Sequence, residues 1–363
     1  MLKRFAVGGE FLIHPGLLFG PYLGQFSKYG LENTGYYRQY TFGAYYSLKV
    51  IIEHLRMDSI QTVLLPSYLC PSIIRPFREA GVSYEFYKLK EGLLPDLGDI
   101  DRKAGPGLKA ILFIDYFGFP QKDYLTEIVS HLRQRGVKIL QDIVQSWVNN
   151  ENYLYGDYCF NSLRKYTPYE ASVLMSRECL CFNTSLKPIL PFLTLKRLAQ
   201  VMRYLHLETG LLFPEAFLGL LDKANACYHQ PGVIGMPGMN RCILDKIDFA
   251  LWGRQRRSVF KLILNSSRPN LIIKRELGNV VPLGMAVYLQ DRDAKKLALH
   301  KLGVHCPLHW LLPEEIDRKE HEYSWDLQKH ALTLPLVVDP QFLGKYLCTI
   351  HKIINGVKFE SDV

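Results

Sequence analysis

The chain has 363 residues, of which 48% are hydrophobic and 22% are charged, which is the composition of a folded globular protein. Its 44 lysines and arginines outnumber its 35 aspartates and glutamates, and the net charge of +9 favours anionic partners such as nucleotides and phosphates. Its eight cysteines are scattered and form no CxxC pair, so we expect no metal site and a reducing cytoplasm. No apolar stretch reaches about 18 residues, so we expect no membrane span.

The first two-thirds of the chain alternates between helical and strand-like segments. Residues 43–56 have the apolar spacing of a helix, and TVLLP at 62–66 is typical of a buried strand. After a loop and a helix closed by Gly81, the pattern predicts strands at 83–89, 108–118 and 137–142 and a helix at 123–136. Short apolar strands that alternate with helices predict an α/β fold with a mostly parallel sheet covered on both faces.

Polar and aromatic side chains follow several of these predicted strands. Pro66-Ser67-Tyr68, Asp115-Tyr116 and Asp142 each stand at the carboxyl end of a strand. Ligands of parallel α/β sheets bind at those ends. The sequence therefore predicts a binding site on one rim of the sheet.

The last third has a different pattern. Residues 190–230 are helical in spacing, 279–304 is typical of a strand, a turn and a helix, and 330–354 of a strand and a helix. We expect a large α/β domain over 1–239 and a smaller α+β domain over 240–363. The densest basic run, Arg254 to Arg257, has no nucleic-acid-binding signature, so we interpret it as a solvated helix face and expect no nucleic acid.

A carboxylate, a hydroxyl and an amine follow one another near the predicted site. Asp142 ends a strand, and Ser162 and Lys165 lie in the next segment, GDYCFNSLRKYTP. Asp142 could ion-pair with a pyridine nitrogen, Lys165 could condense with an aldehyde, and Ser162 could donate to a phosphate. Gly43-Ala44 opens the first helix, whose free amides and dipole suit the same phosphate. Together these are the needs of pyridoxal 5′-phosphate.

The same segments resemble the DegT/StrS family of pyridoxal-phosphate sugar aminotransferases, which have fold type I. The resemblance runs through VLLPSYLCPSIIRPFREAG, AILFIDYFGFP, ILQDIVQSW and GDYCFNSLRKYTP, and GVHCPLHWLLP resembles a family branch found with surface-polysaccharide genes. It implies that Lys165 binds the cofactor aldehyde and that Asp142 pairs with the ring nitrogen. Gln145 would contact the ring, while Ser162, Gly43 and Ala44 would hold the phosphate.

The resemblance also marks where this chain departs from the family. The aromatic residue that stacks on the ring falls at Cys70, so Tyr68 or Tyr116 is expected to replace it. Ala44 stands where a polar residue is common, Gln141 where a glutamate is common, and residues 168–172 lack the usual glycines. His309 and Trp310 are candidates for the substrate pocket, with a packed structural pair as the alternative.

The implied function is transamination of a nucleotide-linked keto sugar with an amino-acid donor, in amino-sugar or surface-polysaccharide biosynthesis. The alternative is a catalytically altered or inactive protein with a binding or regulatory role, while sugar dehydration is disfavoured because it usually replaces the lysine by histidine. A homodimer with shared sites is expected from fold type I. Aromatic residues crowded into positions 19–46 add support, because such residues are enriched in interface cores, with packing on their own subunit as the alternative.

Overall fold

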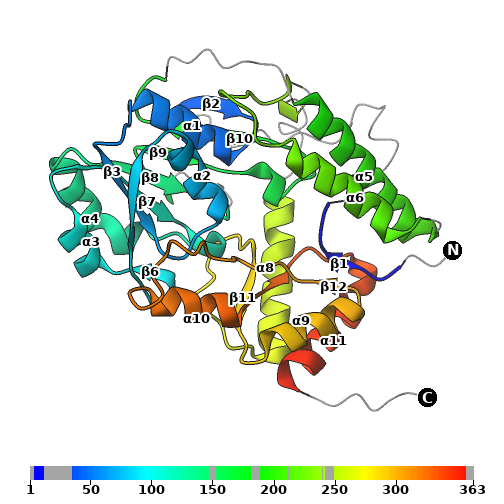
Figure 1. The fold of residues 1–363 in the computed structure, drawn as a ribbon. Helices are drawn as coiled ribbons and strands as arrows, with labels where there is room; N and C mark the ends of the chain where they lie inside the picture. Colours follow the sequence, from blue (N-terminus) through cyan, green and yellow to red (C-terminus); the bar gives the residue numbers. More distant parts are fainter. Residues whose placement is uncertain are drawn as a thin grey trace.

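A computed structural model describes residues 4–11, 35–146, 153–180, 189–210, 212–238, 240–241 and 249–356 of the chain. A seven-stranded sheet dominates it, with the strand order β2-β10-β9-β8-β7-β3-β4 (Figure 1). These strands are β2 Tyr37–Thr41, β3 Thr62–Pro66, β4 Ser83–Tyr87, β7 Leu108–Ile114, β8 Lys138–Asp142, β9 Tyr158–Phe160 and β10 Ser172–Ser176. The five from β4 to β9 are parallel, and only β10 runs antiparallel to its neighbours, which confirms the predicted mostly parallel sheet.

Four helices of this half pack around the sheet. They are α1 Ala44–His54, α2 Pro71–Glu79, α3 Leu97–Lys103 and α4 Lys122–Gln134. In Figure 1, α1 lies beside β2 and β10, and α3 and α4 lie to the lower left of the strands. The inner face of α1, from Tyr45 to Ile52, is buried against β9 and β10, as the apolar spacing of 43–56 predicted. A short hairpin, β5 Leu89–Lys90 and β6 Leu94–Pro95, follows β4.

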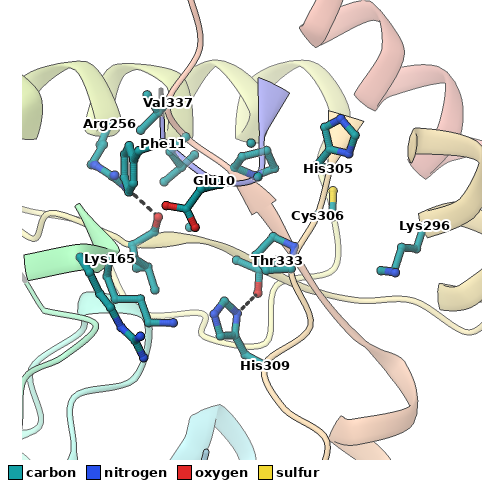
Figure 2. A pocket seen from close by; sticks show the side chains of 18 of the residues that line it. Glu10, Phe11, Lys165, Arg256, Lys296, His305, Cys306, His309, Thr333 and Val337 are labelled. Carbon is teal, nitrogen blue, oxygen red and sulfur yellow. Dashed lines mark hydrogen bonds between the residues drawn. The ribbon is translucent and has the colours of Figure 1, made fainter. Parts of the chain in front are cut away.

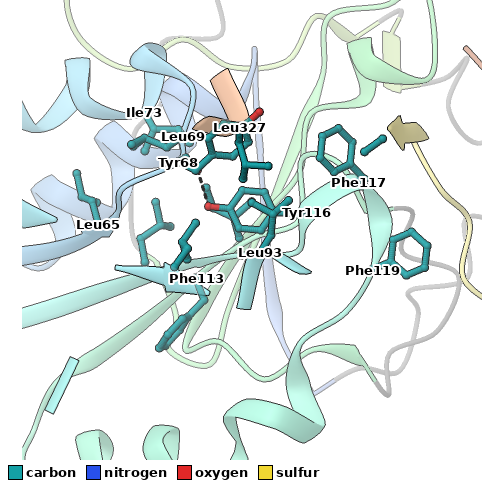
Figure 3. Close-up of a cluster of buried hydrophobic side chains, with 14 of the residues drawn as sticks. Leu65, Tyr68, Leu69, Ile73, Leu93, Phe113, Tyr116, Phe117, Phe119 and Leu327 are labelled. Atoms are coloured by element: carbon teal, nitrogen blue, oxygen red, sulfur yellow. Dashed lines mark hydrogen bonds between the residues drawn. The ribbon is translucent and has the colours of Figure 1, made fainter. Parts of the chain in front are cut away.

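The core of the sheet domain is dense in aromatic rings. Figure 3 shows part of it, where Tyr68, Phe113, Tyr116 and Phe117 pack with Leu65 and its aliphatic neighbours. The Tyr116 hydroxyl donates to the backbone carbonyl of Tyr68 over 2.5 Å, so this buried phenol is satisfied inside the core.

The second half of the chain contains longer helices and a small antiparallel sheet. Its elements are α5 Leu190–Thr209, α6 Pro214–Ala226, α8 Phe249–Ser267, β11 Gly284–Tyr288, α9 Arg292–Lys301, β12 Val304–His305, α10 Glu322–His330, β13 Ala331–Pro335 and α11 Leu343–Asn355. Strand β11 pairs with β13, α5 packs on α6, and α8 packs on α11. No helix within the described ranges has both the length and the apolar surface needed to cross a bilayer.

The first described strand lies with the last third of the chain. Strand β1, Val7–Gly8, pairs in parallel with Val304 and His305 of β12. Figure 1 shows this dark-blue strand next to α9 and α11. The N-terminal residues therefore contact the C-terminal elements, whereas the predicted division assigned them to the large domain.

The interpretation of Arg254 to Arg257 as a solvated helix face is wrong for one residue. Arg254 is exposed on α8, but Arg256 is only 4% exposed. A helix turns about 100° per residue, so Arg256 lies on the inner face together with the buried residues Val259, Phe260 and Ile263.

Candidate active site

Two parallel strands and the segment after a third bring the predicted site residues to one edge of the sheet. Asp142 at the end of β8 lies opposite Ile114 of β7 and Phe160 of β9. The backbone N–H of Asp115, just beyond β7, donates to the Asp142 carbonyl over 3.0 Å. Ser162 and Lys165 follow β9 directly, so they stand beside Asp142 as the strand order requires.

Asp142 is a buried carboxyl group. Its side chain is 3% exposed and accepts one backbone hydrogen bond, from Val144 N–H over 2.7 Å. Burial raises the pKa of Asp142 to about 7, although the Val144 hydrogen bond and the charge of Lys165 act in the opposite direction. A carboxyl group in this position would ionise fully beside a bound cationic group.

Lys165 ends a short 3₁₀ turn, Leu163–Lys165, that is closed by a 3.1 Å hydrogen bond from Lys165 N–H to the Ser162 carbonyl. Its side chain is half-buried and forms no ion pair within the described part of the chain. Burial lowers the pKa of Lys165, and the adjacent Arg164 charge lowers it further. The amine is therefore a better nucleophile at neutral pH than a surface lysine.

Two cavities meet at Lys165 and Arg164, which line both. The smaller one, of about 260 Å³, is lined by Ala44, Asp142, Gln145, Ser162, Trp310 and others. The larger one, of about 460 Å³, extends toward the C-terminal elements (Figure 2). The structure thus brings five predicted cofactor-binding residues, Ala44, Asp142, Gln145, Ser162 and Lys165, to one small cavity.

The start of α1 forms one wall of the smaller cavity. Gly43 is its N-cap and provides no side-chain cap, and the amides of Ala44 and Tyr45 have no acceptor within the described residues. A Cβ on Gly43 would lie 2.0 Å from the Tyr228 hydroxyl, so only glycine fits this position. Free amides at a helix N-terminus that face a cavity are suited to an anion.

A chain of side-chain hydrogen bonds fixes α1 to the strand behind it. Thr41 and Ser47 are joined over 2.7 Å, Ser47 and Ser172 over 2.8 Å, and the Ser172 hydroxyl donates to the Asn161 carbonyl over 2.6 Å. Asn161 precedes Ser162 directly. The network therefore sets the helix N-terminus and the Ser162–Lys165 turn in one rigid arrangement.

Gln145 provides an unused donor. Its Oε1 accepts from Phe117 N–H over 2.8 Å, while its Nε2 is buried without a partner within the described ranges. A buried amide N–H without an acceptor costs about 1–3 kcal/mol. An acceptor atom of a ligand in the cavity would remove this cost.

Several solved structures share this fold. A putative sugar aminotransferase from Streptococcus pneumoniae, in its PMP form, aligns with a TM-score of 0.66 and 12% identity over 88% of each chain. A DegT DnrJ EryC1 StrS aminotransferase from Brucella abortus aligns at 0.59 and 11% identity over 88% of this chain and 86% of its own. A mutant GDP-4-keto-6-deoxymannose-3-dehydratase with bound GDP-perosamine aligns at 0.60 and 13% identity, over 86% and 88%.

This chain has the fold of the DegT/StrS-type sugar aminotransferases. The predicted fold type I architecture is therefore confirmed over most of the chain. Neither a protein-family model nor a curated protein sequence matches the chain.

Within this aminotransferase fold, the two predicted stacking tyrosines lie away from the small cavity. Tyr68 and Tyr116 are at most 1% exposed and belong to the core shown in Figure 3. Instead Trp310 lines the cavity together with Cys70, with its ring centroid 5.5 Å from that of Tyr68. The sequence predicted Trp310 only as a substrate residue. No local sequence pattern indicates that a loop 240 residues beyond Cys70 packs next to it.

His309 faces the larger cavity. Its Nδ1 is 2.8 Å from the Thr333 hydroxyl, and its backbone carbonyl accepts from the Tyr68 hydroxyl. Burial lowers the pKa of His309 to about 3, with a further contribution from the Lys165 charge. The imidazole is therefore neutral at physiological pH. The two predicted substrate residues thus lie on either side of Lys165, one in each cavity.

The departures from the family pattern have structural explanations. Gln141 donates to Asp115 over 2.9 Å and accepts from the backbone of Tyr155 and Gly156, so its amide has the partners it needs. None of residues 168–172 has a positive φ, and the backbone passes the site without needing glycine. In that loop, Glu170 is buried and bound to Lys196 over 2.5 Å.

Proposed function

We propose that this protein is a pyridoxal-phosphate-dependent aminotransferase. The observation that carries the proposal is one cavity that combines a buried carboxyl group, Asp142, with a lysine of lowered pKa, Lys165. Such a pair of groups with opposite pKa shifts in one pocket is typical of catalytic sites. The neighbouring structures include PLP and PMP forms of a sugar aminotransferase, which supports the same cofactor here.

The residues present fit this cofactor. A phosphate would find the free amides of Ala44 and Tyr45 and the Ser162 hydroxyl, and a ring substituent would find the unpartnered Gln145 amide. About 260 Å³ is space for a one-ring molecule, below the roughly 300–1,000 Å³ of pockets for larger ligands.

Each residue then has a definite task. When bound, pyridoxal phosphate supplies an electron sink for the carbon that gains or loses the amino group. Asp142 would hold a proton on the ring nitrogen through its charge. Lys165 would hold the cofactor at its aldehyde group and, as general base, would move a proton to and from the reacting carbon.

The proposed substrates are a nucleotide-linked keto sugar and an amino-acid donor, in cytoplasmic amino-sugar or surface-polysaccharide biosynthesis. Neighbours named as sugar aminotransferases, and a dehydratase holding GDP-perosamine, support a sugar nucleotide. Retention of Lys165 favours transamination over dehydration.

We also propose a homodimer that shares its two sites. The proposal rests on fold type I and on the aromatic residues of positions 19–46. Of these, Phe19, Tyr22, Phe26 and Tyr29 lie outside the described residues. Phe42, Tyr45 and Tyr46 are buried among side chains of this same chain, whereas Tyr37 is 55% exposed on β2, an edge strand of the sheet.

The amino-donor half-reaction tests the proposal. Protein loaded with pyridoxal phosphate is mixed with L-glutamate or L-glutamine, and conversion of the cofactor to its amine form is followed by absorbance. We expect conversion in wild type and none in Lys165→Ala. If neither amino acid converts the cofactor in the loaded wild-type protein, the result would instead support the inactive, regulatory alternative.

A further inference from the structure

The larger cavity carries an excess of positive charge. Arg164, Lys165, Arg256 and Lys296 line it, and among the described residues Glu10 is its single carboxylate. Figure 2 shows Lys165 on the left of the cavity, Lys296 on the right and Glu10 between them. His300 and His305, with Nδ1 atoms 3.0 Å apart, add two further nitrogen-bearing side chains.

The one carboxylate does not neutralise these cations. Glu10 Oε1 lies 3.5 Å from Lys196 Nζ and accepts from Gln200 Nε2 over 3.1 Å. Lys196 is itself bound to the buried Glu170. The Glu10 carboxylate is thus hydrogen-bonded on the α5 side of the cavity. Its charge acts on Arg164, but it forms no ion pair with Arg164 or Arg256.

Arg256 is the strongest sign of a missing partner. It is 4% exposed, yet no carboxylate of the described chain pairs with it, and its Nη1 donates only to the carbonyls of Leu283 over 2.7 Å and Pro282 over 3.4 Å. Its guanidinium lies 4.9 Å from the Tyr166 ring, and burial lowers the pKa of Arg256. A buried guanidinium without a counter-charge is costly unless a ligand provides one.

Arg164 is a second arginine of the same cavity that lies close to a tyrosine ring. Its guanidinium lies 5.0 Å from the Tyr228 ring and forms no ion pair within the described ranges, and it lines both cavities. Both guanidinium groups lie over tyrosine rings, 4.9 Å and 5.0 Å from the ring centroids, and a guanidinium group carries several N–H donors in a planar fork. That geometry suits bidentate contact with phosphate or carboxylate oxygens.

We propose that the 460 Å³ cavity binds the anionic group of a substrate, a phosphate or a carboxylate, with Arg256 as its principal contact and Lys296 at the far rim. This inference rests on the proposed function, because it makes the larger cavity the substrate side of Lys165. The N-terminal Gly8–Glu10 segment and His305 of β12, with which Gly8 pairs, both line this cavity.

Direct binding measurements on protein loaded with pyridoxal phosphate test the inference without relying on turnover. Isothermal calorimetry is performed separately with inorganic pyrophosphate, UDP and L-glutamate. If pyrophosphate and UDP bind and compete with each other, the cavity is a phosphate site. If glutamate is the one ligand of the three that binds, the cavity is a carboxylate site. Either result supports the inference, and no binding of any of the three overturns it.

The variants are Arg256→Gln and Lys296→Gln, with Arg254→Gln and Lys301→Gln as controls on the same two helices. Arg254 and Lys301 are exposed and do not line the cavity. We expect Arg256→Gln to weaken the bound anion at least about tenfold, as loss of a charged hydrogen bond predicts. Lys296→Gln should weaken it about threefold, and the controls should not change it.

Lys296 is half-buried on α9 and has no described hydrogen bond, so its variant should fold even where Arg256→Gln does not. Unchanged affinity in both folded variants would overturn the inference. If loaded protein forms normally but binds no anion, the inference alone fails. If pyridoxal phosphate does not bind at all, the proposed function fails first.

Discussion

Two residues of the small cavity, Asp142 and Trp310, carry consequences that can be measured one side chain at a time. Burial raises the pKa of Asp142 from 3.8 to about 7. The folded protein therefore holds this proton at pH values where the unfolded chain has released it. The contribution of Asp142 to the free energy of unfolding is therefore fully present below about pH 4, and it is lost as the pH rises to about 7.

Asp142→Asn removes that ionisation. We expect the cofactor-free variant to exceed wild type in free energy of unfolding at pH 8 by up to about 4 kcal/mol, at about 1.4 kcal/mol per pKa unit, and to approach it near pH 4. Urea unfolding at both pH values measures the difference. The same variant should lose most turnover, because an amide holds no proton on a ring nitrogen by charge. Equal stability at pH 8 would show that Asp142 does not ionise in a buried site.

Trp310 lines the small cavity together with Cys70, and we propose that it supplies the aromatic contact to the cofactor ring. An aromatic contact contributes about 0.5–1.5 kcal/mol beyond its buried area, so Trp310→Leu should weaken pyridoxal phosphate binding about two- to tenfold. Trp310→Phe should retain most of the affinity. Leu311→Ala is the control, because Leu311 is 68% exposed next to it. Absorbance titration gives the affinities, and equal values for the Leu and Phe variants would contradict an aromatic role.

At the scale of elements, the start of α1 is built around a single glycine. A Cβ on Gly43 would lie 2.0 Å from the Tyr228 hydroxyl oxygen but 3.3 Å from the next ring atom. Gly43→Ala should therefore cost about 1–3 kcal/mol by overpacking and weaken cofactor binding. Adding Tyr228→Phe should recover most of both losses.

Gly344→Ala, in α11, is the matched control, because a Cβ there meets nothing within 4 Å. Chemical unfolding and absorbance titration report stability and cofactor affinity for all three proteins. If Tyr228→Phe does not rescue Gly43→Ala, the close approach of α1 to Tyr228 is not what requires glycine.

The elements that sequence predicted well are those with strong periodicity. The helix at 43–56 and the strands at 62–66 and 137–142 have strong apolar patterns. Such a local pattern is enough to predict the element. Strands β1 and β12 have two residues each, too few for any pattern, and they form only because residues 297 positions apart meet. Pairing of that kind is decided by tertiary contacts and leaves no local signal.

At the scale of the whole molecule, the candidate site is where the sheet half and the C-terminal half meet. Asp142, Ser162 and Lys165 were predictable because strand ends converge in any parallel sheet. The place of Trp310 beside Cys70 and the burial of Arg256 were not, because each residue reaches the site from a distant loop or helix. Arg256 is also one charge in a basic run, and only its rotation on α8 buries it.

The central claim is that Lys165 is the residue that holds pyridoxal phosphate. The most direct measurement is reduction of the cofactor-loaded protein with borohydride, proteolysis and mass-spectrometric mapping of the fixed cofactor. Our account predicts one modified peptide, containing Lys165, and no modification in Lys165→Ala while that variant keeps its fold by circular dichroism. A label on another lysine, or no label on fully folded wild-type protein, would contradict it.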